Sequence, residues 1–213
     1  MKGHLWDWFW DRSGIAFRHV PNDYVKMRSF IGVELDHVIK EELAQLQERL
    51  RDSGADVKWV RPGNIHLTLK FLGNVAEERI SEIASILDNL ARNNKPFAIS
   101  LFKVGCFPRL ESPRVVWVGI DQGCSEAERI ADTLEDELEK LGFLKEKRKF
   151  SAHLTLGRVR SPKNRKNLVE KIKALDYKSS ARMNVCKLTL FKSTLTSQGS
   201  IYTALHEANL NKD

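Results

Sequence analysis

Residues 65–72 read IHLTLKFL, and the tetrapeptide HLTL at 66–69 recurs unchanged at 153–156. Both copies lie in apolar runs typical of β-strands, and each is preceded by a strand-like and a helix-like region. An exact repeat in matching surroundings predicts two similar lobes, each contributing one copy.

The alternation of side chains along a strand gives this tetrapeptide its chemical meaning. The leucines of each copy should face a core. The polar residues should share the opposite face: His66, Thr68 and Lys70 in the first copy, His153 and Thr155 in the second. If the two lobes face each other, two imidazoles and two hydroxyls converge on one small volume.

Hydrolysis of a phosphodiester by in-line attack suits this set of groups. It needs a base for the attacking water, an acid for the leaving oxygen, and donors for the nonbridging oxygens. A histidine with a pKa of about 6.5 can serve as either acid or base near neutral pH. The sequence therefore predicts metal-independent catalysis with His66 and His153 as the acid–base pair and no cofactor.

Two other interpretations of the histidines compete with this one. A single histidine in a strand is usually structural, but two identical copies weaken that interpretation. A metal site would need further ligands, such as H-x-H, H-E-x-x-H or a nearby carboxylate, and neither copy has them. We therefore favour acid–base catalysis over both.

Strand and helix signals alternate from residue 27 onward. Helices are expected at 37–52, 77–93, 125–141 and 162–174. Strands are expected at 29–35, 57–60, 65–72, 97–106, 114–120, 152–159, 183–190 and 201–207. No glycine-rich phosphate loop follows the first strand, and several strands alternate polar and apolar residues. We therefore expect an α+β fold with mainly antiparallel sheets, and not a doubly wound parallel sheet.

Composition narrows the class of protein. The 213 residues are 42% hydrophobic and carry a formal charge of +7, which favours a polyanionic partner such as nucleic acid. Cys106, Cys124 and Cys186 are far apart and show no disulfide or zinc spacing, as in a cytoplasmic protein. No apolar run is long enough to cross a bilayer. We expect a cytoplasmic protein that acts as a monomer.

Residues 1–26 differ from the rest of the chain. Three of the five tryptophans, Trp6, Trp8 and Trp10, lie within this segment, and a strand-like run begins just after Met27. We predict that residues 1–26 are an extension outside the fold and that 27–213 form a single bilobal domain. The alternative is a docked N-terminal arm anchored by its tryptophans.

Three segments resemble signatures of the prokaryotic LigT/ThpR group of two-histidine (2H) phosphoesterases. They are 59–73 (WVRPGNIHLTLKFLG), 113–119 (PRVVWVG) and 150–159 (FSAHLTLGRV). The resemblance covers residues 27–213. It implies a bilobal α+β fold with two pseudo-symmetric lobes flanking a central cleft, and hydrolysis of RNA 2',3'-cyclic phosphate ends to 2'-phosphomonoesters.

The resemblance also implies roles for individual residues. His66 would protonate the leaving 3' oxygen, His153 would activate water, and Thr68 and Thr155 would hold the phosphoryl oxygens. Arg158 matches an arginine that contacts the phosphate. Regular alternation would put Arg158 on the face away from His153, so its role requires a β-bulge or the end of the strand.

Several points stay open at this level. Lys70 could attract the RNA backbone or be a solvated lysine, and Phe107 and Trp117 could stack on a base or belong to the core. A 2'-5' RNA ligase or 2'-5' phosphodiesterase would share the same residues. A noncatalytic module that binds RNA ends would not need a paired acid and base.

Overall fold

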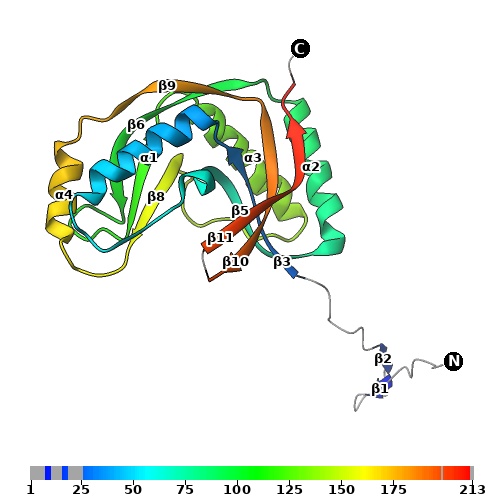
Figure 1. Cartoon of the computed structure of the whole chain (residues 1–213). Helices are drawn as coiled ribbons and strands as arrows, with labels where there is room; N and C mark the ends of the chain where they lie inside the picture. Colours follow the sequence, from blue (N-terminus) through cyan, green and yellow to red (C-terminus); the bar gives the residue numbers. More distant parts are fainter. Residues whose placement is uncertain (1–7, 11–15, 19–25, 198, 212–213) are drawn as a thin grey trace.

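A single large antiparallel sheet dominates the computed structural model, which describes residues 8–10, 16–18, 26–197 and 199–211 (Figure 1). The strand order is β11-β10-β3-β5-β8-β7-β6-β9, and β4 also pairs with β8. The nine strands are β3 Lys26–Glu34, β4 Val57–Trp59, β5 His66–Ala76, β6 Phe97–Phe107, β7 Val115–Ile120, β8 His153–Val159, β9 Lys178–Val185, β10 Lys187–Thr196 and β11 Gly199–Asn209. The predicted α+β class with antiparallel strands is confirmed.

The helices found in the described residues lie close to their predicted positions. They are α1 His37–Arg51, α2 Ile80–Arg92, α3 Cys124–Lys140 and α4 Arg165–Ala174, with the short 3-10 helices η1 Pro62–Asn64 and η2 Glu77–Arg79. No helix in this part of the chain is long and apolar enough to span a membrane.

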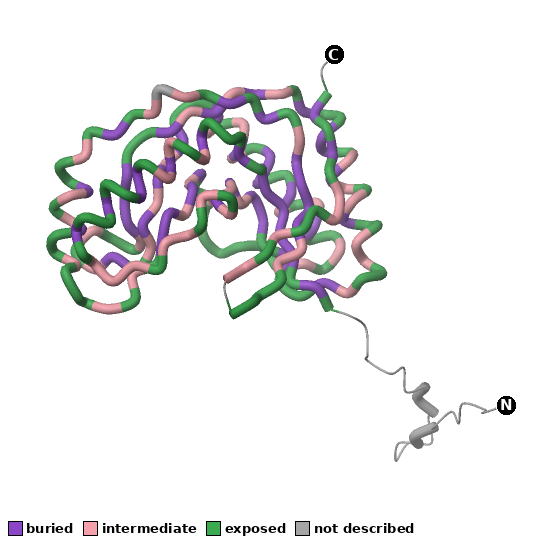
Figure 2. The backbone as a smooth tube through the Cα atoms, in the orientation of Figure 1, coloured by how far each residue is buried: buried purple, intermediate pink, exposed green. Residues whose placement is uncertain are grey.

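Helix α1 illustrates how the sequence sets these elements. The Asp36 carboxylate accepts a hydrogen bond from the backbone N–H of Ile39 at 2.9 Å, which satisfies a donor left free at the helix start. Leu43, Leu46 and Leu50 recur at helical spacing and are fully or almost fully buried. Figure 2 shows that such buried positions line the inner sides of the helices and the sheet, while exposed positions face outward.

The two halves of the sheet are joined at the centre by a single residue pair between β5 and β8. Strands β5 and β8 share one pair of opposite residues, Leu67 and Leu154. Strands β3, β10 and β11 extend to one side of this junction, and β7, β6 and β9 extend to the other. These two sets of strands are the two lobes that the repeat predicted.

The helices interlock the two lobes. Helix α3 follows β7 in the chain but contacts β5 and α2 in the other lobe. Helix α1 follows β3 but contacts β9 and α4, again in the other lobe (Figure 1). Because each lobe contributes a helix to its neighbour, the lobes are expected to unfold as one unit.

One predicted strand is wrong. The structure divides residues 183–190 at Cys186, where the chain passes from β9, which pairs with β6, to β10, which pairs with β3. The apolar residues Met183 and Val185 alternate in one phase, and Leu188 and Leu190 alternate in the other. This phase change in the sequence could have marked the break.

The N-terminal prediction concerns residues that are mostly outside the described part, since 1–7, 11–15 and 19–25 are not described. Strands β1 Trp8–Trp10 and β2 Ala16–Arg18 pair with each other in a separate two-stranded sheet. The nine-stranded sheet begins at Lys26, which pairs with Ala76, and Met27 is buried.

Candidate active site

The two HLTL segments, one in β5 and one in β8, lie side by side at the centre of the sheet. Leu67 and Leu154 are directly opposite each other, and both are fully buried. Because side chains alternate along a strand, the residues that flank these leucines point to the other face of the sheet.

Four polar side chains form a two-by-two cluster on that other face. The antiparallel register puts His66 opposite Thr155 and Thr68 opposite His153, and all four residues are half-buried. The histidines are therefore diagonal neighbours, for which a separation of about 7 to 8 Å is typical. A phosphate placed between them would have one imidazole on each side.

A β-bulge interrupts the first HLTL segment. The register of β5 with β3 passes from Thr68 opposite Gly32 to Lys70 opposite Ile31, which leaves Leu69 as the extra residue. A bulge adds one residue to one strand and so reverses the alternation beyond it.

The second HLTL segment contains the same bulge. The register of β8 with β7 passes from Thr155 opposite Trp117 to Gly157 opposite Val116, which leaves Leu156 unpaired. The two lobes therefore repeat both the sequence of the motif and its backbone irregularity.

This second bulge brings Arg158 to the face of His153. Arg158 lies three residues after Thr155, so regular alternation would have pointed it away. The extra residue at Leu156 restores it to the site face, where its side chain is exposed and its charge lowers the pKa of His153. The predicted role of Arg158 required a bulge or the end of the strand, and the structure has a bulge at Leu156.

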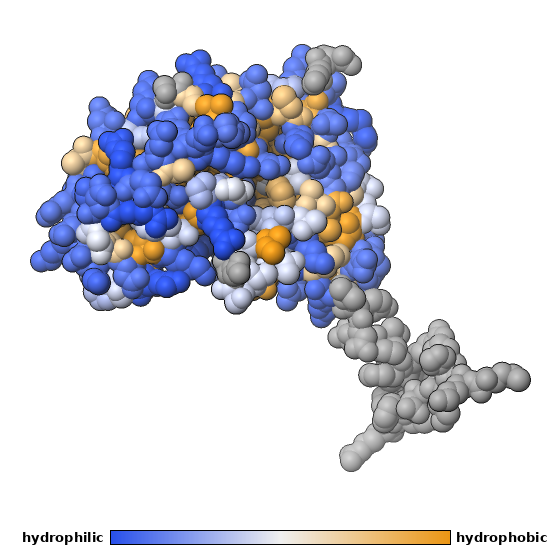
Figure 3. Space-filling view, viewed as in Figure 1, coloured by the Kyte–Doolittle hydropathy of each residue, from blue (hydrophilic) through white to orange (hydrophobic). Residues whose placement is uncertain are grey.

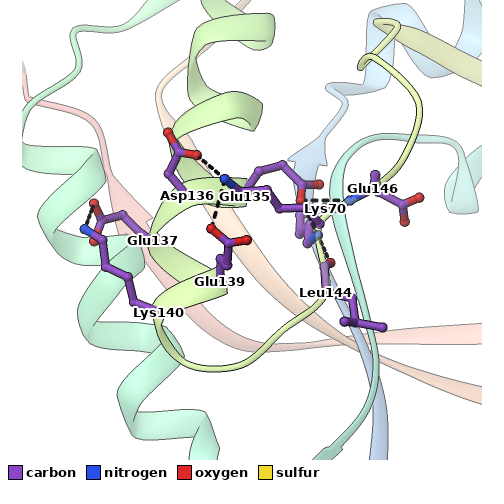
Figure 4. Close-up of polar contacts among 9 residues, drawn as sticks. Lys70, Glu135, Asp136, Glu137, Glu139, Lys140, Leu144 and Glu146 are labelled. Atoms are coloured by element: carbon purple, nitrogen blue, oxygen red, sulfur yellow. Dashed lines mark hydrogen bonds and ion pairs between the residues drawn. The ribbon is translucent and has the colours of Figure 1, made fainter.

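The first bulge has the opposite effect on Lys70. Its side chain is 1% exposed, and Nζ lies 2.5 Å from Oε2 of Glu135 on α3 and 2.7 Å from the carbonyl oxygen of Leu144 (Figure 4). The prediction that Lys70 shares the face of His66 and binds substrate is wrong, because the bulge at Leu69 turns it toward the helices.

The Lys70 ion pair also fixes the segment that leads into β8. The second Oε2 contact of Glu135 is the backbone N–H of Glu146, at 3.1 Å. Beside it, Nζ of Lys145 lies 2.8 Å from Asp136 and 3.0 Å from Glu139 (Figure 4). Residues 144–146 are therefore held by Lys70 of β5, which binds Leu144, and by helix α3, which binds residues 145 and 146.

Both histidine rings are oriented in the same way. Nδ1 of His66 lies 2.8 Å from the carbonyl oxygen of Asn64, and Nδ1 of His153 lies 2.7 Å from the carbonyl oxygen of Ser151. A carbonyl oxygen can only accept, so Nδ1 must carry the proton in each ring. Nε2 is then the atom of each imidazole that can exchange a proton with a ligand.

Aromatic side chains pack against the His66 ring. Phe30 of β3 stacks on it with ring centroids 4.5 Å apart, and Tyr202 of β11 meets it edge-on at 5.0 Å. Neither Phe30 nor Tyr202 was predicted from the sequence to lie at the site. Neither has a local signal, because the contact depends on how β3 and β11 come to lie near β5.

The His153 ring has its own aromatic neighbours. Phe107 meets it edge-on at 5.0 Å, and Trp117 lies 6.5 Å away. The sequence left open whether these two residues stack on a base or belong to the core. The structure places them against the histidine, half-buried at the edge of the site.

Burial depresses the pKa of both histidines below its ordinary value. For His66, burial is the larger effect, and the hydrogen bond to Asn64 acts in the opposite direction. For His153, burial is again the larger effect, the bond to Ser151 opposes it, and Arg158 lowers the pKa further. Arg158 acts on His153 and not on His66, and its charge favours the neutral form of His153.

The remaining groups of the cluster are available to a ligand. Among the described residues, the hydroxyls of Thr68 and Thr155 have no hydrogen-bond partner, and neither hydroxyl is a buried atom. The same part of the chain holds no group of three or more His, Cys, Asp or Glu side chains placed to bind a metal ion. The site thus offers two imidazoles, two hydroxyls and a guanidinium.

A matching histidine and threonine in each half of one antiparallel fold is the arrangement of the two-histidine phosphoesterases. The family model described as LigT like Phosphoesterase matches residues 33–117 and again 118–202. Each match contains one HLTL segment, and together they span most of the chain. The protein belongs to the LigT-like phosphoesterase family.

Relatives in other organisms cover nearly the same region. A protein of Archaeoglobus fulgidus is 40% identical over 182 residues, which are 84% of this chain and 98% of the relative. One of Methanothermobacter thermautotrophicus is 38% identical over 181 residues, covering 84% and 96%. Both relatives are named RNA 2',3'-cyclic phosphodiesterase.

Solved structures show the same fold. The protein TT0787 of Thermus thermophilus is 27% identical, with a TM-score of 0.74 over 88% of this chain and 100% of that one. E. coli LigT complexed with 3'-AMP gives a TM-score of 0.72 at 23% identity, over 88% of this chain and 99% of that one. The bilobal LigT-like fold that the sequence predicted is confirmed.

Proposed function

We propose that the protein hydrolyses RNA 2',3'-cyclic phosphate ends to 2'-phosphomonoesters by acid–base catalysis without a metal. The observation that carries this proposal is the two-by-two cluster, in which both imidazoles present Nε2 and both Nδ1 atoms are held by backbone carbonyls. The names of the relatives support the choice of an RNA cyclic phosphate as substrate.

Burial lowers the pKa of both histidines, and the base role is assigned to His153 because Arg158 acts on that ring alone. Neutral His153, whose pKa is lowered first by burial and further by Arg158, accepts a proton from the attacking water. The water oxygen bonds to phosphorus, and the bond from phosphorus to the 3' oxygen breaks. Protonated His66 gives its Nε2 proton to that oxygen, which leaves a 3' hydroxyl and a 2'-phosphate.

The other polar groups stabilise charge during this step. The hydroxyls of Thr68 and Thr155, which have no partner among the described residues, can donate to the nonbridging oxygens as negative charge develops on them. Arg158 is on the same face and offers a cation to the phosphate. The RNA end is thus the binding partner that we propose for this face.

The test is an RNA that ends in a 2',3'-cyclic phosphate, incubated with the protein in EDTA. We expect it to be opened to a 2'-phosphate, as identified by nuclease mapping of the product. His66→Ala and His153→Ala should each lower turnover by about 100- to 10,000-fold. The double variant should lose less than the product of the two effects, since the pair acts as a unit.

His37→Ala serves as the matched control. His37 lies on the exposed surface of α1, where it contacts Glu41, and its loss should leave turnover unchanged. Retention of full activity by either active-site variant, or loss of activity in EDTA, would contradict the proposed chemistry.

A further inference from the structure

A row of positively charged side chains extends from the active site along β8 and its neighbour β4. Lys58 of β4 is directly opposite Arg158 of β8. On these two strands Val57 and Val159 pack against the core, so Lys58 and Arg158 point the other way, to the face that carries His153. Both cations are exposed.

The row continues to Arg160. Its backbone N–H donates to the carbonyl oxygen of Asp56 at 2.8 Å, which extends the pairing of β8 with β4 by one residue. Alternation then returns Arg160 to the same face as Arg158, about 7 Å further along the strand. This spacing resembles that between successive phosphates of an extended nucleic acid strand.

This arrangement is unfavourable unless an anion is present. Like charges directly opposite each other on neighbouring strands repel and destabilise the sheet. Lys58, Arg158 and Arg160 form no ion pair with any described residue. Asp56 lies opposite Arg160 and is the one carboxylate in the row, so the row keeps a net positive charge.

We propose that Lys58 and Arg160 form a second phosphate-binding subsite, which holds the phosphate on the 5' side of the terminal nucleotide. The inference rests on the proposed function, because it assigns the reactive cyclic phosphate to the cluster of His66 and His153. It identifies the substrate class as the end of an RNA strand, in preference to a free nucleoside cyclic phosphate.

Most of the surface visible in Figure 3 is hydrophilic, as expected for a chain in which 30% of the residues are charged. Contacts with phosphates carry no sequence information. The subsite should therefore select RNA by the presence of a phosphate and accept any base at the end.

Two small substrates test the inference: adenosine 2',3'-cyclic phosphate and its 5'-phosphorylated form. At low salt, the wild-type protein should prefer the 5'-phosphorylated substrate in kcat/KM by about threefold to fivefold, as expected for one exposed charged contact. In Lys58→Gln the ratio between the two substrates should fall, and in Lys58→Gln combined with Arg160→Gln it should be about one. Lys95→Gln, which removes an exposed lysine outside the row, should keep the wild-type ratio.

Two further measurements sharpen the result. Asp56→Asn removes the only carboxylate of the row and should raise the ratio. In the wild type, kcat/KM for the 5'-phosphorylated substrate should fall more steeply with added salt, because salt screens the additional contact between exposed charges. Lys58→Gln combined with Arg160→Gln should lose this difference in slope.

The possible outcomes separate the two proposals. Equal kcat/KM for the two substrates in the wild type, or an unchanged ratio in Lys58→Gln, would overturn the subsite and leave the proposed function intact. Hydrolysis of neither substrate and of no cyclic RNA end would overturn both.

Discussion

The two catalytic candidates are defined less by their residue type than by what holds each ring. A backbone carbonyl two residues earlier binds Nδ1 of both His66 and His153, and aromatic rings cover their sides. These contacts fix the tautomer and restrict rotation, so Nε2 is already aimed before a ligand binds. Burial of the rings lowers both pKa values, and the hydrogen bonds to the carbonyls oppose this effect only in part.

The depressed pKa values predict the pH dependence of kcat/KM. A base works when neutral, so the rate rises with pH through the pKa of His153. An acid works when protonated, so the rate falls through the pKa of His66. Both values lie below 6.5, and the maximum of kcat/KM should therefore lie below pH 6.5. A profile with no change between pH 4 and 9 would rule out paired histidine catalysis.

Arg158 allows the two histidine roles to be distinguished. Its charge lowers the pKa of His153, so Arg158→Gln should move the limb that reports His153 to higher pH. If His153 is the base, the rising limb of the kcat/KM profile moves, and the falling limb stays in place. Arg158→Lys keeps the charge and should keep the wild-type profile. Movement of the falling limb alone would reverse the assignment of acid and base.

At the level of the strands, the paired bulges decide which residues reach the site. One extra residue after each H-x-T unit turns Lys70 to the helices in β5 and Arg158 to the face of His153 in β8. Regular alternation of side chains would put Lys70 on the face of His66 and Arg158 on the face away from His153, and the two bulges reverse both positions. Bulge positions depend on pairing with the neighbouring strand, and the neighbour is not visible in the local sequence.

The ion pair of Lys70 and Glu135 should matter for stability. Lys70→Met leaves a largely buried carboxylate without its partner and should reduce the free energy of unfolding by about 3 kcal/mol, as measured in urea. Replacing both partners, Lys70→Met with Glu135→Leu, should recover much of the loss.

The matched control is Lys140→Met, which breaks a pair of similar length on the surface. Lys140 and Glu137 lie 2.6 Å apart, but the lysine side chain is 66% exposed. An exposed pair contributes less than about 1 kcal/mol. Equal losses in Lys70→Met and Lys140→Met would show that burial does not decide the effect.

For the whole molecule, the nine-stranded sheet begins at Lys26, and the two earlier strands among the described residues, β1 and β2, pair with each other. A chain that starts at Met27 should therefore keep its melting temperature and its turnover of cyclic RNA ends. A marked fall in either value would favour the docked N-terminal arm. Circular dichroism on heating and the cyclic-end assay provide the two measurements.

The sequence by itself determined the class of fold, the repeat and the polar set of His66, Thr68, His153 and Thr155. It could do so because periodicity and an exact repeat are local properties of a chain. Only the tertiary structure decided which faces Lys70 and Arg158 take, which aromatic rings cover the histidines, and that Lys58 stands beside Arg158. Those facts depend on strand register between segments far apart in the chain, and register is set by packing of the whole sheet.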